Sequence, residues 1–184
     1  MGSRAQRRGK FSVDPVALLQ REHEMIREQL AMIETTIGTR SVRRGVLTKT
    51  NRNTLRELLR FFTRRVSIHF KRESMLIAAL RRVLDWRHDE RNQFQSLLDE
   101  HRMLKADAST LMKKLTAKEK DADGGLSLLP EQNNGFRTLA AELRTFVRRY
   151  RGHLSCEERI LFVLADMRLP ATQKQRVSHR MLQV

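Results

Sequence analysis

Apolar residues recur along most of this chain at spacings of three and four positions, which is the period of one face of an α-helix. The pattern predicts four long amphipathic helices, over residues 15–37, 53–83, 89–120 and 135–165. Alternation of apolar and polar residues, which is typical of a strand, extends over no useful length. The sequence therefore predicts an all-α protein.

Residues that favour helix ends and turns separate the four segments. Asp14 and Pro15 are typical of the start of a helix, and Gly38 is typical of its end. Residues 38–52 and 121–134 are rich in Thr, Ser, Gly and Asn and are interpreted as loops. Four long helices joined in this way predict an antiparallel up-down-up-down four-helix bundle.

The same boundaries divide the chain into three parts. Residues 1–13 form a basic arm, residues 14–166 the four-helix domain, and residues 167–184 a C-terminal tail with room for a short helix near 172–182. With 184 residues in total, the chain is long enough for one domain with a sizeable core.

Composition adds expectations about partners and location. The net charge of +16 favours nucleic acid or an acidic partner, although arginines lie on every predicted helix and a generally basic surface is the simpler interpretation. The single cysteine excludes an internal disulfide. The chain has no secretory segment and no apolar run near the ~20 residues that a membrane span needs. We expect a cytoplasmic protein.

Histidine and glutamate supply the candidate chemistry. Each predicted helix has one histidine on its apolar face, and two of these histidines are followed by a glutamate four residues later. Positions four apart share a helix face, and counting from the shared end of the bundle at ~1.5 Å per residue puts all six side chains within about two turns of one level. The candidate metal ligands are His23, His69, Glu73, His101, His153 and Glu157.

A metal centre explains this set better than ordinary core packing. One His-x-x-x-Glu pair is common on helix surfaces, and one buried histidine is usually hydrogen-bonded within the core. Two buried carboxylates without an evident lysine or arginine partner are costly unless a cation neutralises them. Histidine and carboxylate ligands suit iron, zinc or manganese, so the residue types alone leave the metal open.

The order of these motifs resembles the hemerythrin-like, or HHE cation-binding, domain family over roughly residues 14–166. The matching elements are His23, His69-Phe70-x-x-Glu73, Glu100-His101 and His153-x-x-x-Glu157-Glu158. The resemblance implies a left-handed hemerythrin-like bundle with a non-haem di-iron centre, whose two iron ions share an oxo or hydroxo bridge. It also implies that the four histidines are terminal ligands and that Glu73 and Glu157 bridge the two ions.

The chain departs from the oxygen-carrying members of that family. They have a further histidine one turn after the third-helix ligand, where this chain has Lys105. They also have an aspartate where this chain has Glu158, although Glu157 is the better placed ligand. The four-histidine, two-glutamate set is more similar to di-iron proteins of nitrosative-stress defence and iron–sulfur cluster repair, whose cysteine-bearing N-terminal domain this sequence does not contain.

A ligand set with one histidine fewer implies an open position on each iron. The hypothesis is therefore a protein that binds dioxygen or nitric oxide, in sensing or stress response. The alternatives are a redox enzyme with ferroxidase, peroxidase or nitric-oxide reducing activity, and an iron-responsive regulator that contacts nucleic acid. The sequence does not decide whether a substrate is turned over. Tyr150 is either a hydrogen-bond donor to the bound ligand or a core residue. Glu22 and Glu100 are interpreted as surface charges in preference to the alternative, which is a supporting role behind the ligand histidines.

Overall fold

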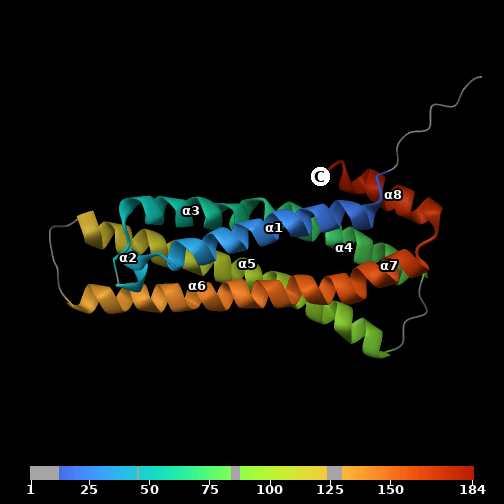
Figure 1. Cartoon of the computed structure of the whole chain (residues 1–184). Coiled ribbons are helices and arrows are strands. Elements are labelled where there is room, and N and C mark those ends of the chain that lie inside the picture. The colour runs from blue at the N-terminus through green and yellow to red at the C-terminus, as the bar shows by residue number, and fades with distance from the viewer. Residues whose placement is uncertain (1–12, 45, 84–87, 124–129) are drawn as a thin grey trace, which may run out of the picture.

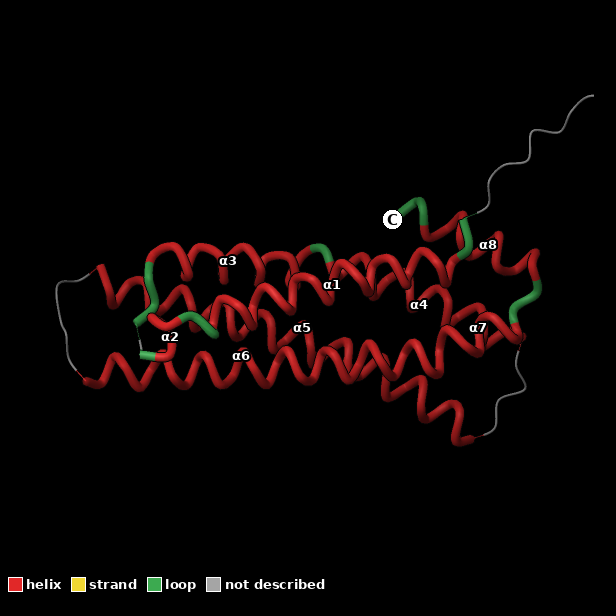
Figure 2. Tube along the Cα trace, viewed as in Figure 1, coloured by secondary structure: helices red, strands yellow, loops and turns green. Residues whose placement is uncertain are grey.

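The computed structural model describes residues 13–44, 46–83, 88–123 and 130–184, without the side chains of residues 88–91, 118–123 and 130–135. The predicted basic arm lies outside these residues except for Val13. The described part is helical throughout, with short connections and no strand, so the all-α prediction is confirmed (Figure 2). Its elements are α1 Pro15–Ile37, α2 Arg40–Arg43, α3 Lys49–Arg64, α4 Val66–Val83, α5 His88–Asp123, α6 Pro130–Glu157, the π-helix η1 Glu158–Phe162, α7 Val163–Arg168 and α8 Ala171–Met181.

Four long rods make up the bundle (Figure 1). They are α1, then α3 with α4, then α5, and finally α6 continued by η1 and α7. The short helix α8 packs at one end, against α4 and α1. The predicted four-helix bundle is therefore confirmed. None of the helices that the structure describes is long and apolar enough to cross a membrane.

The first rod has the bounds that its sequence predicts. The Asp14 carboxylate accepts hydrogen bonds from the backbone N–H groups of Val16 (2.8 Å) and Ala17 (3.1 Å), which are unpaired at any helix start. At the other end, the N–H of Gly38 donates to the carbonyl of Glu34 at 2.8 Å. Hydrogen bonds formed by nearby residues are therefore enough to set where this helix begins and ends.

The second rod differs from its prediction in two ways. It begins at Lys49 instead of residue 53, because the Thr48 hydroxyl accepts a hydrogen bond from the N–H of Asn51 (3.2 Å) and caps the helix there. It is also divided at Arg65, where the N–H of Ile68 donates to the Arg65 carbonyl at 3.0 Å in a tightened turn. Arg65 keeps helical dihedral angles (φ −67°, ψ −42°), so the rod continues through the division.

The later helices are longer than predicted, and the predicted loop 38–52 contains the short helix α2. The predicted loop 121–134 shrinks because α6 starts at Pro130, a residue that disrupts helix interiors but is favoured in the first turn. Residues 124–129 lie outside the described part. The fourth rod widens into a π-helix directly after Glu157, and such widened turns are frequent at functional sites.

The apolar core has two parts. One cluster contains Ile26, Val66, Leu104 and Leu154, and lies toward the α2 end of the bundle. The other contains Leu19, Leu76, Leu97 and Leu161, and lies toward α8. On each rod, the histidine lies between a residue of one cluster and a residue of the other.

Candidate metal centre

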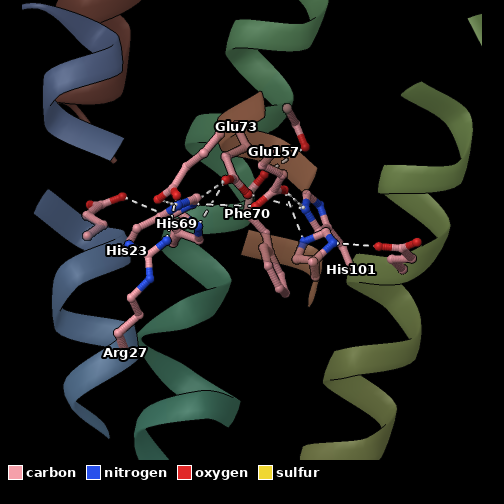
Figure 3. Close-up of polar contacts among 12 residues, drawn as sticks. His23, Arg27, His69, Phe70, Glu73, His101 and Glu157 are labelled. Atoms are coloured by element: carbon pink, nitrogen blue, oxygen red, sulfur yellow. Dashed lines mark hydrogen bonds and ion pairs between the residues drawn. The ribbon is translucent and has the colours of Figure 1, made fainter. Parts of the chain in front are cut away.

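The six candidate ligands lie in the layer between the two apolar clusters. All six residues are buried, and none is more than 5% exposed. Figure 3 shows Glu73 and Glu157 in the middle of this layer, with His23 and His69 on one side and His101 on the other. The structure thus brings together all six residues that helical counting places at one level.

Glu73 lies against the histidines of the first two rods. Its Oε1 is 3.0 Å from Nε2 of His69 and 3.3 Å from Nε2 of His23. Nε2 of His23 is also 3.4 Å from Oε2 of Glu157. These four residues form a group whose possible ligand atoms all lie within 4.8 Å of one another.

Glu157 lies against the histidines of the other two rods. Its Oε1 is 2.8 Å from Nε2 of His101 and 3.0 Å from Nε2 of His153. Nε2 of His101 is also 3.2 Å from Oε2 of Glu73. All four imidazoles therefore direct the same nitrogen at the two central carboxylates.

Several buried atoms in this layer have no hydrogen-bond partner among the described residues. They are Nε2 of His69, Nε2 of His153, Oε2 of Glu73 and Oε2 of Glu157. The two nitrogens are 3.0 Å from carboxylate oxygens, but in directions that do not make hydrogen bonds. Buried polar groups are nearly always satisfied. His69 and His153 belong to different groups of donors, so two divalent cations, one in each group, would satisfy all four atoms. The donor set fits a metal centre.

Without a cation, the carboxylates raise the pKa values of the imidazoles. Burial lowers the pKa of His23, but hydrogen bonds and charge from Glu157 and Glu73 outweigh it and raise the pKa to about 9. Burial also lowers the pKa of His69, but the charge of Glu73 and the hydrogen bond to Glu22 outweigh it and raise the pKa to about 10. Against the effect of burial, Glu157 and Glu73 raise the pKa of His101 to about 9. Cations must therefore displace protons from this layer.

The central carboxylates are held in their ionised form. Burial and the charge of Glu73 raise the pKa of Glu157, but the close contacts with the imidazoles of His101, His153 and His23 more than offset both and lower it to about 2. Burial likewise raises the pKa of Glu73, and the charge of His69 with further histidine hydrogen bonds brings it well below its usual range.

An outer ring of carboxylates orients three of the four imidazoles. In each case the Nδ1–H donates to a glutamate of another rod, so Nε2 is the nitrogen from which a cation would displace the proton. The pairs are His23 with Glu158 (2.9 Å), His69 with Glu22 (2.9 Å) and His153 with Glu100 (2.7 Å).

Two arginines fix two of these outer carboxylates. Arg27 donates to Glu158 at 2.6 Å, and this arginine is visible beside His23 in Figure 3. Arg72 donates to Glu22 and, through its Nε, to the backbone carbonyl of Met181 at 2.9 Å. The end of α8 is therefore connected to His69 through two side chains.

The sequence interpretation of Glu22 as a surface charge is wrong, because it is buried. For Glu100 that interpretation is incomplete, because its side chain is 42% exposed but its carboxylate also contacts His153. Each glutamate precedes a candidate ligand and points away from it, but it contacts the histidine of a neighbouring rod. A usable signal was the Glu-His pair, which occurs in both the first and the third helix. Glu158 contacts Nδ1 of His23 instead of the central layer.

Tyr150 lies beside the centre, as its place on the helix face suggests. Its ring centroid is 6.2 Å from that of His153, and its buried hydroxyl has no hydrogen-bond partner among the described residues. Burial, together with the charges of Glu73 and Glu157, raises the pKa of this phenol well above its usual value. Lys105, at the position of the fifth histidine of oxygen carriers, is exposed.

Comparison with known families agrees with this geometry. The sequence model of the family described as "Hemerythrin HHE cation binding domain" matches residues 14–181. The chain belongs to this family. The match includes α8, which lies beyond residue 166. No curated protein and no solved structure matches the chain significantly.

Proposed function

We propose that the central layer binds two iron ions. His23 and His69 would bind one ion, His101 and His153 the other, and Glu73 and Glu157 would lie between them. The observation that supports this most is the set of buried, inward-facing Nε2 and carboxylate oxygen atoms that have no hydrogen-bond partner. Family membership favours iron, and metal analysis separates it from zinc and manganese.

The second part of the proposal is that the centre binds dioxygen or nitric oxide, in sensing or stress response. Iron held by two imidazoles and shared carboxylates keeps positions open to such ligands. Around it, Phe162 packs against His23 (ring centroids 4.9 Å apart) and Phe70 stacks on His101 (4.0 Å), so apolar side chains exclude water. The Tyr150 hydroxyl is the candidate donor to a bound ligand.

Tyr150 also favours a second candidate function, a di-iron redox enzyme. A buried phenol beside the centre could donate a hydrogen bond that stabilises negative charge on a reacting ligand. The net charge of +16 supports a polyanionic partner for either function, either nucleic acid or an acidic protein.

Anaerobic reconstitution with Fe²⁺ tests the proposal. We expect two iron ions per chain, and a spectrum that changes on adding dioxygen or nitric oxide. An adduct that disappears when the gas is removed supports ligand binding, whereas repeated consumption of the gas in stopped-flow experiments supports an enzyme.

Alanine substitution of each central glutamate tests the ligand assignment. Glu73→Ala and Glu157→Ala each remove a carboxylate that contacts histidines of three rods, so iron content should fall below two per chain. Lys105→Ala, at an exposed position, is the control and should retain both ions. Two ions with an unchanged spectrum in either glutamate variant would contradict the assignment.

A further inference from the structure

The candidate metal centre is built from two similar pairs of helices. The α1–α4 half contains Glu22-His23 and His69-x-x-x-Glu73. The α5–α6 half contains Glu100-His101 and His153-x-x-x-Glu157. Because the two halves use the same residue types in the same order, any difference between them as cation sites must come from their surroundings.

The first difference is the number of donors already close together. In the α1–α4 half, His23, His69 and Glu73 form a compact group that also includes Glu157. The corresponding group in the α5–α6 half has three members, His101, His153 and Glu157. His101 also contacts both central carboxylates, but a cation in the α1–α4 half finds four donors close together, where the α5–α6 half offers three.

The second difference is the number of imidazoles that are oriented by a hydrogen bond from Nδ1–H to a carboxylate. Both histidines of the α1–α4 half donate Nδ1–H to a carboxylate. In the α5–α6 half His153 does so, while Nδ1 of His101 has no hydrogen bond to any residue that the structure describes. At the position matching Glu158, α4 has Ser74, whose hydroxyl donates to the Phe70 carbonyl at 2.8 Å.

The third difference is the anchoring of the outer carboxylates. Glu22 is held by Arg72 and its side chain is 11% exposed. Glu100 is 42% exposed and, among the described residues, has no ion pair with an arginine or lysine. The position matching Arg72 in α6 is Cys156. Solvent therefore competes for the carboxylate that orients His153.

One effect acts in the opposite direction. The charge of Glu100 is not neutralised by an arginine, so it attracts a cation more than the pairs Glu22–Arg72 and Glu158–Arg27 do. However, an exposed charge is strongly screened. Loss of a carboxylate partner from a metal-binding histidine typically lowers metal affinity by about 10- to 100-fold. The hydrogen bonds from the imidazoles to their carboxylate partners should therefore decide which half binds a cation more tightly.

We propose that the two halves bind cations in a fixed order, the α1–α4 half first and at least about tenfold more tightly. This inference rests on the proposed metal centre. It implies a protein with one firmly held ion and one exchangeable ion, so a one-ion form is populated over a range of metal concentrations. Residues Glu22, Glu158, Arg27 and Arg72 act as positioning residues for the first ion.

A matched pair of ligand variants tests the order. Co²⁺ is titrated into metal-free protein, and binding is followed by calorimetry and by the visible spectrum. Two steps alone prove little, because two divalent ions repel each other at any pair of sites. His101→Ala should retain the first step, with a Kd within about threefold of the original, whereas His23→Ala should lose it and bind the remaining ion about tenfold or more weakly. Equal effects, or the reverse order, would overturn the proposal.

A second pair of variants leaves all six candidate ligands in place. It keeps the test valid if an alanine variant fails to fold. Glu22→Gln should weaken the first step about tenfold, while Glu100→Gln should weaken only the second. Circular dichroism monitors folding. If the unmodified protein binds no Co²⁺, the proposed metal centre itself is wrong. If it binds two ions but the two variants within each pair have equal effects, the metal centre stands and only the proposed order of binding is wrong.

Discussion

A histidine binds a cation only through a ring nitrogen that has no proton, so the partner of its other nitrogen matters as much as its position. Helical periodicity is enough to predict that six side chains face inward at one level. It does not predict that Glu22 orients His69 or that Glu100 orients His153. The sequence shows which face a residue lies on, but the residue opposite is determined by how the rods pack.

Tyr150→Phe removes only the hydroxyl that has no partner. Iron content should be unchanged, because the phenol is not among the ligands. If the hydroxyl donates to a bound diatomic molecule, the adduct should dissociate about 2- to 12-fold faster, since one hydrogen bond contributes about 0.5–1.5 kcal/mol. Stopped-flow measurement of dissociation checks this, and an unchanged rate would exclude the donor role.

At the scale of elements, features with local causes were predictable and features with distant causes were not. The capped start of α1 follows from Asp14 and Pro15. The π-helix after Glu157 leaves no trace in the apolar period. It begins where two consecutive residues have different roles, Glu157 in the central layer and Glu158 as the outer partner of His23. Neighbours in a regular α-helix point about 100° apart.

The connection between α4 and α8 gives a prediction for stability. Arg72→Gln removes the charge that holds Glu22 and weakens the contact with the Met181 carbonyl, so the free energy of unfolding should fall by about 1.5–3 kcal/mol. The control is Arg102→Gln, which affects the exposed pair with Asp99 and should cost at most about 0.5 kcal/mol. Urea unfolding of both variants measures the difference. Equal losses would show that Arg72 contributes no more than a surface pair.

At the scale of the whole molecule, the bundle and its family were predictable because the apolar pattern and the histidine spacing extend over most of the chain. A short helix near residues 172–182 was expected from the sequence, but its contact with the bundle was not, because that contact depends on Arg72 of a distant segment. The ligand motifs of the two halves match, so the sequence does not show that the histidines of the α1–α4 half have more firmly held carboxylate partners. That difference is visible only in the structure.

The stability of the metal-free protein and that of the metal-loaded protein should depend on pH in opposite directions. In the metal-free fold the pKa values of His23, His69 and His101 are raised from 6.5 to about 9–10. Their stabilising contribution is therefore complete below pH 6.5 and is lost as pH rises through 9–10. The pKa of Glu157 is lowered to about 2, so its contribution is present above pH 4.5 and is lost as pH falls toward 2.

Thermal unfolding between pH 6 and 9.5 measures this dependence. The Tm of metal-free protein should fall as pH rises over this range. The Tm of metal-loaded protein should not show this fall, and should drop instead toward acid pH, where protons compete with cations for the imidazoles. A metal-free Tm that rises from pH 6.5 to 9.5 would contradict the ion pairs described for the central layer.

The division of the apolar interior by one polar layer has a consequence for how long the protein survives in a cell. The two apolar clusters are separate. The stability of the bundle therefore depends on how the charges of the carboxylates and imidazoles between them are neutralised. A ligand present at 100 times its Kd adds about 2.7 kcal/mol to the folded state, and a difference of this size changes the abundance of a protein exposed to proteases several-fold. Cation supply should thus regulate the turnover of the polypeptide as well as its chemistry.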